Sequence, residues 1–352
     1  MKRKLRLTAL AVAVAVALAL TNSALAAYTP RFAVSHNGGA KVGLHPTTLH
    51  VTIAQSDSPT AAIQFYVPTG YAVQSAAPGS TIGRATAAVF ARDTGLTLPL
   101  EGPVTADDPA KHATDACSPG MNFAVWLLAL SVAGQPVTIP VYVNPTPSAA
   151  SALGAYVIRA CLPPPDVPAA TPGRALLGAQ LLDVSFTVNN LTLPSGSDTT
   201  VWRTLFTPYT PGVGTPDLAG TVEARSFVRL PGAISLRAKY VRKTHTYRLS
   251  GSVTEAGRPS AGATVQIFRG RTASRLAKAS STKVQESGSY ATAGHLTPKK
   301  TTYFQTRVRV GERVDAGGCA QTLAPFGATP PPCVGSTDGG FVAVSTILRI
   351  KP

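Results

Sequence analysis

The stretch YRLSGSVTEAGRPSAGATVQIF, residues 247–268, decides the fold, because apolar and polar side chains alternate along it with a period of two. Successive side chains of a β-strand point to opposite faces, so Leu249 and Val253 lie on one face of a first strand. A turn through Gly257 and Pro259 follows, and a second strand begins after it. The positions predicted to face inward are Tyr247, Leu249, Gly251, Val253, Ala263, Val265 and Ile267.

The same alternation recurs through the rest of the chain, in LHVTIAQ (49–55), AIQFYVP (62–68) and QLLDVSFTVNN (180–190). MNFAVWLLALSVAGQPVTIPVYVN (121–144) predicts a hairpin with strands at 122–132 and 137–143, turning at Gly134. Its continuous apolar first half is also compatible with a buried helix, but Pro140 and the strand that follows favour a strand. We therefore predict an all-β fold of two β-sandwich-like domains.

Residues 233–352 resemble bacterial Ig-like or prealbumin-like modules, whose pattern is L-x-G-x-V followed by G-x-P-x-x-G-A-x-V and a later Gly-x-Tyr. The resemblance implies an Ig-like sandwich and brings no activity with it, because such modules serve many functions. VWRTLFTPYTPG (201–212) and EARSFVRLPG (223–232) are similar to segments of exported bacterial proteins with the same two-part layout. The matching residues are Leu249, Gly251, Val253, Gly257, Pro259, Gly262, Ala263, Val265, Gly288 and Tyr290.

The first 26 residues have the layout of a secretory signal peptide. A basic head of four Lys and Arg residues precedes an apolar run from Leu7 to Leu20, and Ala24 and Ala26 supply the small residues of a cleavage site. The run is shorter than the roughly 20 residues of a membrane span, and no later segment is apolar enough for one. We expect an extracellular or cell-envelope protein with two domains, residues 27–232 and 233–352, and no transmembrane segment after cleavage.

The cysteine count is even, which in an exported protein indicates disulfides. Three pairings of the four cysteines are open. We prefer Cys117–Cys161 and Cys319–Cys333, because each bond then stays within one predicted domain. No C-x-x-C occurs, so neither thiol exchange nor a thiolate zinc site is indicated.

The net charge of +16 is unevenly distributed. Residues 233–352 hold 18 basic and 5 acidic residues, whereas residues 27–232 hold 10 basic and 11 acidic residues. A strongly basic surface attracts polyanions, although dispersed charge also serves only to keep a protein soluble. No module that recognises nucleic acid is present, so we expect no specific nucleic acid partner. The candidate polyanion-binding residues are Arg237, Lys239, Arg269, Arg271, Arg307 and Arg309.

The stretch TTVWRTLFTPYTPGVGTPD (199–217) concentrates aromatic residues. Trp202, Phe206 and Tyr209 form a candidate ligand platform for sugar rings. Alternatively, Trp202 and Phe206 plug the core at a sandwich end, and Arg203 on the opposite face lies in solvent. We favour this core interpretation.

No motif for catalysis or for a cofactor is present. G-x-S-x-G is absent, and the S-x-x-K at 280–283 falls in a β-rich segment where its Ser and Lys face opposite ways. The loop ADDPAKHATDAC (106–117) gathers Asp107, Asp108, His112 and Asp115, but it lacks the glycine-punctuated spacing of a calcium loop. His45 and His50 lie on opposite faces of a strand, which argues against zinc. We predict no catalytic, cofactor or metal site.

These observations predict a non-enzymatic protein with a binding or spacing role. Its basic module attaches to an anionic cell-surface polymer or polysaccharide. One alternative is a carbohydrate-binding protein that uses residues 199–217. Another is a hydrolase with an unrecognised site in the first domain, for which Asp183 and Glu223 are the carboxylates nearest to strands.

Overall fold

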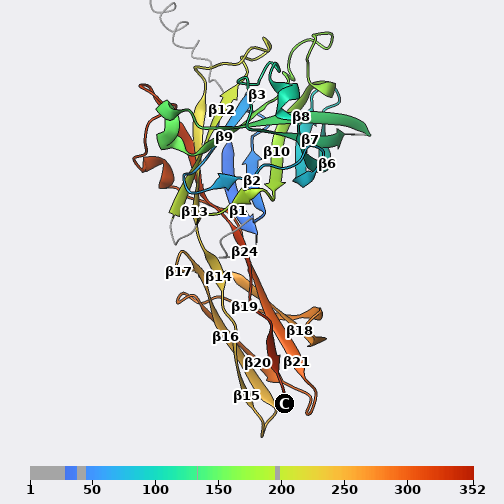
Figure 1. The fold of residues 1–352 in the computed structure, drawn as a ribbon, viewed down its shortest axis with the longest axis vertical. Coiled ribbons are helices and arrows are strands. Elements are labelled where there is room, and N and C mark those ends of the chain that lie inside the picture. The colour runs from blue at the N-terminus through green and yellow to red at the C-terminus, as the bar shows by residue number, and fades with distance from the viewer. Residues whose placement is uncertain (1–27, 38–44, 133, 195–198) are drawn as a thin grey trace, which may run out of the picture.

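The structure is a computed structural model that describes residues 28–37, 45–132, 134–194 and 199–352. The predicted signal peptide lies outside the described residues. The all-β prediction is confirmed. Figure 1 shows an elongated molecule with a large strand ladder at one end and a smaller pair of sheets at the other.

The large ladder runs antiparallel through eleven strands, each hydrogen-bonded to the next. Its strands in spatial order are β1 (Arg31–Asn37), β2 (Thr47–Thr52), β10 (Ala179–Val188), β5 (Thr81–Ala91), β6 (Leu96–Asp107), β7 (Ala124–Val132), β8 (Gln135–Pro145), β9 (Tyr156–Cys161), β3 (Thr60–Val67), β12 (Thr199–Pro208) and β13 (Val222–Arg229).

Strands from the end of the chain close this ladder. β23 (Cys333–Asp338) pairs in parallel with β13, and β24 (Phe341–Val344) pairs in parallel with β1. The Phe227 carbonyl accepts a hydrogen bond from the Gly339 amide at 2.7 Å, and the Gly340 carbonyl accepts one from His36 at 3.2 Å. A Cβ on Gly339 would lie 2.1 Å from the Val34 carbonyl oxygen, so only glycine allows this close crossing.

The ladder encloses one large hydrophobic core. Inward-facing residues alternate with outward-facing ones, as in β2, where buried and half-exposed positions follow each other without a break. The two tryptophans, Trp126 and Trp202, are both fully buried in this core and are among its largest side chains.

The other end of the molecule consists of two sheets that pack face to face across two smaller cores. Leu249 and Val253 from one sheet meet Val265 and Ile267 from the other, as the alternation at residues 247–268 predicts. One sheet holds β14 (Gly232–Ile234), β15 (Arg237–Val241), β16 (Thr246–Glu255), β17 (Arg258–Pro259) and β20 (Ser289–His295). The other holds β18 (Thr264–Thr272), β19 (Arg275–Lys283), β21 (Thr302–Val310), β24 and β25 (Leu348–Ile350).

The predicted domain boundary at residue 232 does not account for one strand that follows it, because that strand belongs to the large ladder. Residues 313–339, the return segment, contain β22 (Arg313–Val314) and β23, and β23 joins the large ladder instead of the basic module. Alternation along the sequence identifies a strand but not the sheet to which it pairs. The prediction therefore assigned residues 313–339 to the basic module, whereas β23 pairs with β13 of the large ladder. β24 then carries the chain back to the smaller sheets, as Figure 1 shows.

Short elements complete the fold. β4 (Ala72–Val73) pairs with β11 (Leu191–Thr192). The described residues contain four short 3-10 helices and no α-helix. None of these four helices is long and apolar enough to span a membrane. These helices are η1 (Pro109–His112), η2 (Ser148–Leu153), η3 (Leu176–Gly178) and η4 (Gly318–Ala320).

Two sequence predictions are confirmed in detail. β7 and β8 form the expected hairpin, and Gly134 between them has a φ of 78°, a conformation that favours glycine. The cysteines pair as Cys117–Cys161 and Cys319–Cys333, with Cα separations of 6.1 and 5.6 Å.

Candidate anion-binding face

The outer side of β18, β21 and β24 carries an exposed pair of arginines, Arg307 and Arg309. Cross-strand register places Arg307 opposite Gln266 and Arg309 opposite Thr264. On the other edge of β21, the two arginines lie opposite Val344 and Val342. A shallow hollow is formed here, and we call this surface the β21 face. Its hollow is lined by Thr264, Gln266, Arg307, Arg309, Gly311 and Val342.

The local sequence explains why both arginines share a face. In TYFQTRVRV, Phe304, Thr306 and Val308 are fully buried, so the residues that alternate with them, Arg307 and Arg309 included, point outward. Arg307 and Arg309 are two positions apart and project side by side.

Aromatic rings flank the charges. The Arg307 Cζ atom lies 5.7 Å from the centre of the Phe268 ring, and the Arg349 Cζ atom lies 5.7 Å from the centre of the Tyr303 ring. Both distances fall within the range of cation–π attraction. These contacts hold the guanidinium groups against the sheet while their N–H groups stay accessible to a ligand.

The charge of this face is uncompensated. Within the part of the chain that the structure describes, Arg313 is the only basic residue after position 232 that forms a salt bridge. Three of the five acidic residues in this region are bound elsewhere: Glu255 to Arg313, Glu312 to His50, and Asp338 to Arg229. Since few carboxylates remain nearby, an anionic ligand meets no competing internal partner.

The six candidate polyanion-binding residues do not form one cluster. Arg237 and Lys239 lie on β15, in the opposite sheet, and Arg269 and Arg271 lie at the end of β18. Only the Arg307–Arg309 pair lines the hollow. The sequence analysis did not identify Gln266, Phe268, Tyr303 and Arg349 as part of this face. The signal was present, because each of them alternates with buried residues along its strand.

The candidate ligand platform at 199–217 is corrected by the structure. Trp202 and Phe206 are completely buried, and Tyr209 is 6% exposed. Trp202 meets Tyr71 edge to face with ring centres 5.1 Å apart, and the Tyr209 hydroxyl donates to the Leu162 carbonyl at 2.5 Å. Trp202 and Phe206 therefore pack in the large core, and none of the three rings is exposed enough to stack on a sugar.

The opposite face of β12 also differs from expectation. Arg203, predicted to lie in solvent, is 4% exposed because the return segment covers it. Its Nε donates to Glu223 at 2.7 Å, and Arg225 Nε donates to the same carboxylate oxygen at 2.9 Å. The Phe326 ring of the return segment lies over the Arg203 guanidinium, 3.8 Å from its Cζ atom.

This Arg203–Glu223–Arg225 cluster is bonded to the loop closed by Cys319–Cys333. Arg225 donates to the carbonyls of Gly318 at 3.1 Å and Gln321 at 2.8 Å, and Arg203 donates to that of Ala324. The neighbouring guanidinium groups keep the pKa of Glu223 below its usual value, against the effect of burial. Glu223 is thus an ionised structural residue beneath a stapled loop.

Asp183, the other carboxylate considered from sequence, is also bound to a basic residue. Asp183 accepts from His50 Nε2 at 2.8 Å, and Glu312 accepts from His50 Nδ1 at 2.7 Å. The hydrogen bond that His50 donates to Glu312 is the largest cause that raises the pKa of His50 to about 9. Asp183 and Glu223 therefore lack the two free, facing carboxyl groups that a glycosidase needs.

The 106–117 loop folds around His112. Its imidazole bridges Asp107 at 3.0 Å and Asp115 at 2.8 Å, and Tyr142 donates its hydroxyl to Asp115 at 2.9 Å. The hydrogen bond from His112 is the main cause that lowers the pKa of Asp107 to about 2. Among the described residues, no group of three or more His, Cys, Asp or Glu side chains is arranged to hold a metal ion.

No family model and no curated protein matches this chain. The chemistry of its surfaces therefore carries the functional argument.

Proposed function

We propose that this chain is an exported, non-enzymatic binding protein that attaches to an anionic polysaccharide through the β21 face. The observation that carries the proposal is the exposed Arg307–Arg309 pair, in which Arg307 lies against the Phe268 ring and neither arginine forms a salt bridge with a described acidic residue. Arginine presents a planar fork of donors that matches a carboxylate in two-point contact.

A polysaccharide fits this face better than a compact anion. The hollow lies on the outer side of the sheet and combines two charges with the amide of Gln266 and the hydroxyl of Thr264. Those groups offer neutral hydrogen bonds to sugar hydroxyls between the charged contacts. A repeating acidic polymer engages several such contacts at once, which raises its overall affinity without any single strong one.

Export is part of the proposal. The first 26 residues have the pattern of a secretory signal peptide, and the two disulfides are compatible with an oxidising extracellular location.

The test compares two double variants of the full chain that lose equal charge. R307Q/R309Q changes the β21 face, whereas R237Q/K239Q removes two positive charges from the exposed edge of the opposite sheet. Binding to immobilised polygalacturonate is measured by titration at 20 and 150 mM NaCl, with neutral dextran as the negative control.

We expect wild-type protein to bind polygalacturonate and not dextran, and to bind more weakly at the higher salt concentration. R307Q/R309Q should weaken binding at least tenfold, and R237Q/K239Q less than threefold. Equal losses in both variants would show that net charge alone drives attachment and would refute the β21 face as the site. Absence of binding by the wild type would refute the proposed function.

A further inference from the structure

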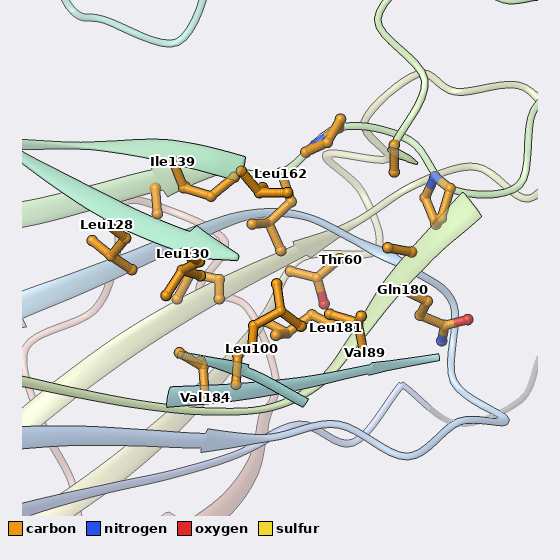
Figure 2. A pocket seen from close by; sticks show the side chains of 18 of the residues that line it. Thr60, Val89, Leu100, Leu128, Leu130, Ile139, Leu162, Gln180, Leu181 and Val184 are labelled. Carbon is orange, nitrogen blue, oxygen red and sulfur yellow. The ribbon is translucent and has the colours of Figure 1, made fainter. Parts of the chain in front are cut away.

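The large core contains a cavity of about 130 Å³ at one end of the ladder. Figure 2 shows side chains from several strands converging on it, with Leu128, Leu130 and Ile139 on one side and Val89, Leu100 and Val184 on the other. Apolar cavities of roughly 150 Å³ are large enough to bind a molecule of the size of benzene.

The lining is chemically uniform. Among the described residues that line it, Thr60 and Gln180 are the only ones with polar side chains, and both already have partners. The Gln180 amide donates to the Asp57 carbonyl at 3.1 Å and accepts from Arg92 at 2.6 Å, and the Thr60 hydroxyl bonds Tyr28 at 2.7 Å. A bound group therefore finds no unpaired donor or acceptor, so it must itself be apolar.

The cavity is reached from solvent. Leu98, Val137 and Ile139 line it and pack against the large core, yet they remain partly exposed. Leu176, which also lines it, is 46% exposed. Inward-facing apolar side chains keep such exposure only where water, or a ligand, reaches the space between them.

Small residues keep the space open. Alanines line the cavity at positions 87, 91, 160, 175 and 179, where larger side chains would fill it. An unfilled apolar cavity lowers stability roughly in proportion to its volume, so a chain without a use for it would gain stability from a single larger residue.

We propose that this cavity binds the end of an unbranched alkyl chain, which enters chain-end first. The volume is too small for a complete long-chain lipid, and the partly exposed rim lets the remainder of the molecule, with its polar group, stay outside. The site is separate from the β21 face, and the two proposals stand or fall independently.

The experiment uses the full chain, with 8-bromo-1-octanol as the quenching probe and 1-octanol as the competitor. Trp126 packs against Phe186 of the cavity wall with ring centres 5.9 Å apart, so 8-bromo-1-octanol bound in the cavity should quench Trp126 fluorescence. We expect saturable quenching that unbrominated 1-octanol reverses by competition. Quenching that rises linearly without saturation, or that 1-octanol does not relieve, would overturn the proposal.

Two filling variants locate the site. Ala87→Leu and Ala160→Leu add bulk to two different strands of the wall, and Ala293→Leu adds the same bulk at an exposed position of β20. Each filling variant that folds should raise Tm without ligand and weaken 1-octanol binding at least tenfold, whereas A293L should bind like wild type. Wild-type affinity in a folded filling variant, or an equal loss in A293L, would place binding elsewhere. If neither variant folds, the competition experiment on wild-type protein decides alone.

Discussion

Replacing Glu223 by Gln tests whether the return segment is held by a buried ionic cluster. Glu223 is 1% exposed and accepts from Arg203 and Arg225, which are 4% and 7% exposed. Glutamine keeps the shape of the side chain and removes its charge, so two buried guanidinium groups lose their common counterion. Breaking a buried ion pair in this way costs about 3–5 kcal/mol.

The matched control is Glu101→Gln. Glu101 accepts from Arg84 at 2.6 Å, a shorter distance than any of the hydrogen bonds to Glu223, but both side chains of that pair are about two-thirds exposed. Exposed pairs contribute about 0–1 kcal/mol. If distance decided the energy, E101Q would be the more damaging change, whereas burial predicts the reverse order.

Urea unfolding, followed by circular dichroism and by tryptophan fluorescence, measures both losses. We expect E223Q to lower the midpoint far more than E101Q, with an unchanged denaturant slope if the native state stays compact. A loss for E223Q that is no larger than that for E101Q would refute the argument, because it would show that the guanidinium groups reach water in the native state.

Three further predictions follow from the contacts described above. Replacing Cys319 and Cys333 by Ser opens a loop of 14 residues and should cost about 3 kcal/mol in urea unfolding. The free energy of unfolding should be highest near pH 6.5. Burial lowers the pKa of His36 to about 3, so stability falls as the pH drops from 6.5 towards 3. The pKa of His50 is raised to about 9, so the stability that His50 contributes is lost as the pH rises from 6.5 to 9. Gly339→Ala should destabilise the protein strongly, because its methyl group would collide with a carbonyl of β1, and Tm should fall.

Each of these has its own control. Reducing agent should lower the midpoint of wild-type protein more than that of the Ser variant, because only the Cys117–Cys161 bond remains to be reduced in the variant. H50Q should flatten the alkaline side of the pH profile and keep the acidic side, and an unaltered alkaline slope would show that His50 does not cause it. Gly311→Ala is the comparison for Gly339→Ala, because a Cβ at Gly311 meets no atom within 4 Å.

The sequence predicted features that depend on short-range pattern. The period of two at residues 247–268 identified the buried side of β16 and β18, and the hairpin of β7 and β8 followed from two apolar runs around Gly134. The cysteine pairing followed from keeping each bond within one predicted domain. The first two of these predictions rest on residues close together in the sequence.

Features that depend on distant partners were missed. Alternation correctly grouped Trp202 with Phe206, but it could not reveal that the opposite face of β12, with Arg203, is covered by residues more than 110 positions later. The cavity was equally hidden, because an alanine in a strand pattern does not show whether a neighbour fills the space beside it. For the same reason, the pairing of β23 with β13 has no local signal.

The return segment has a consequence for how the protein is made. The ladder around the large core lacks its closing strand until residues 333–342 are synthesised, more than 100 residues after the end of β13. A nascent chain therefore keeps the outer edge of β13 unpaired while the strands from β14 to β22 are synthesised. Neither end of the molecule can be inherited, exchanged or duplicated as a contiguous gene fragment without taking a strand from the other.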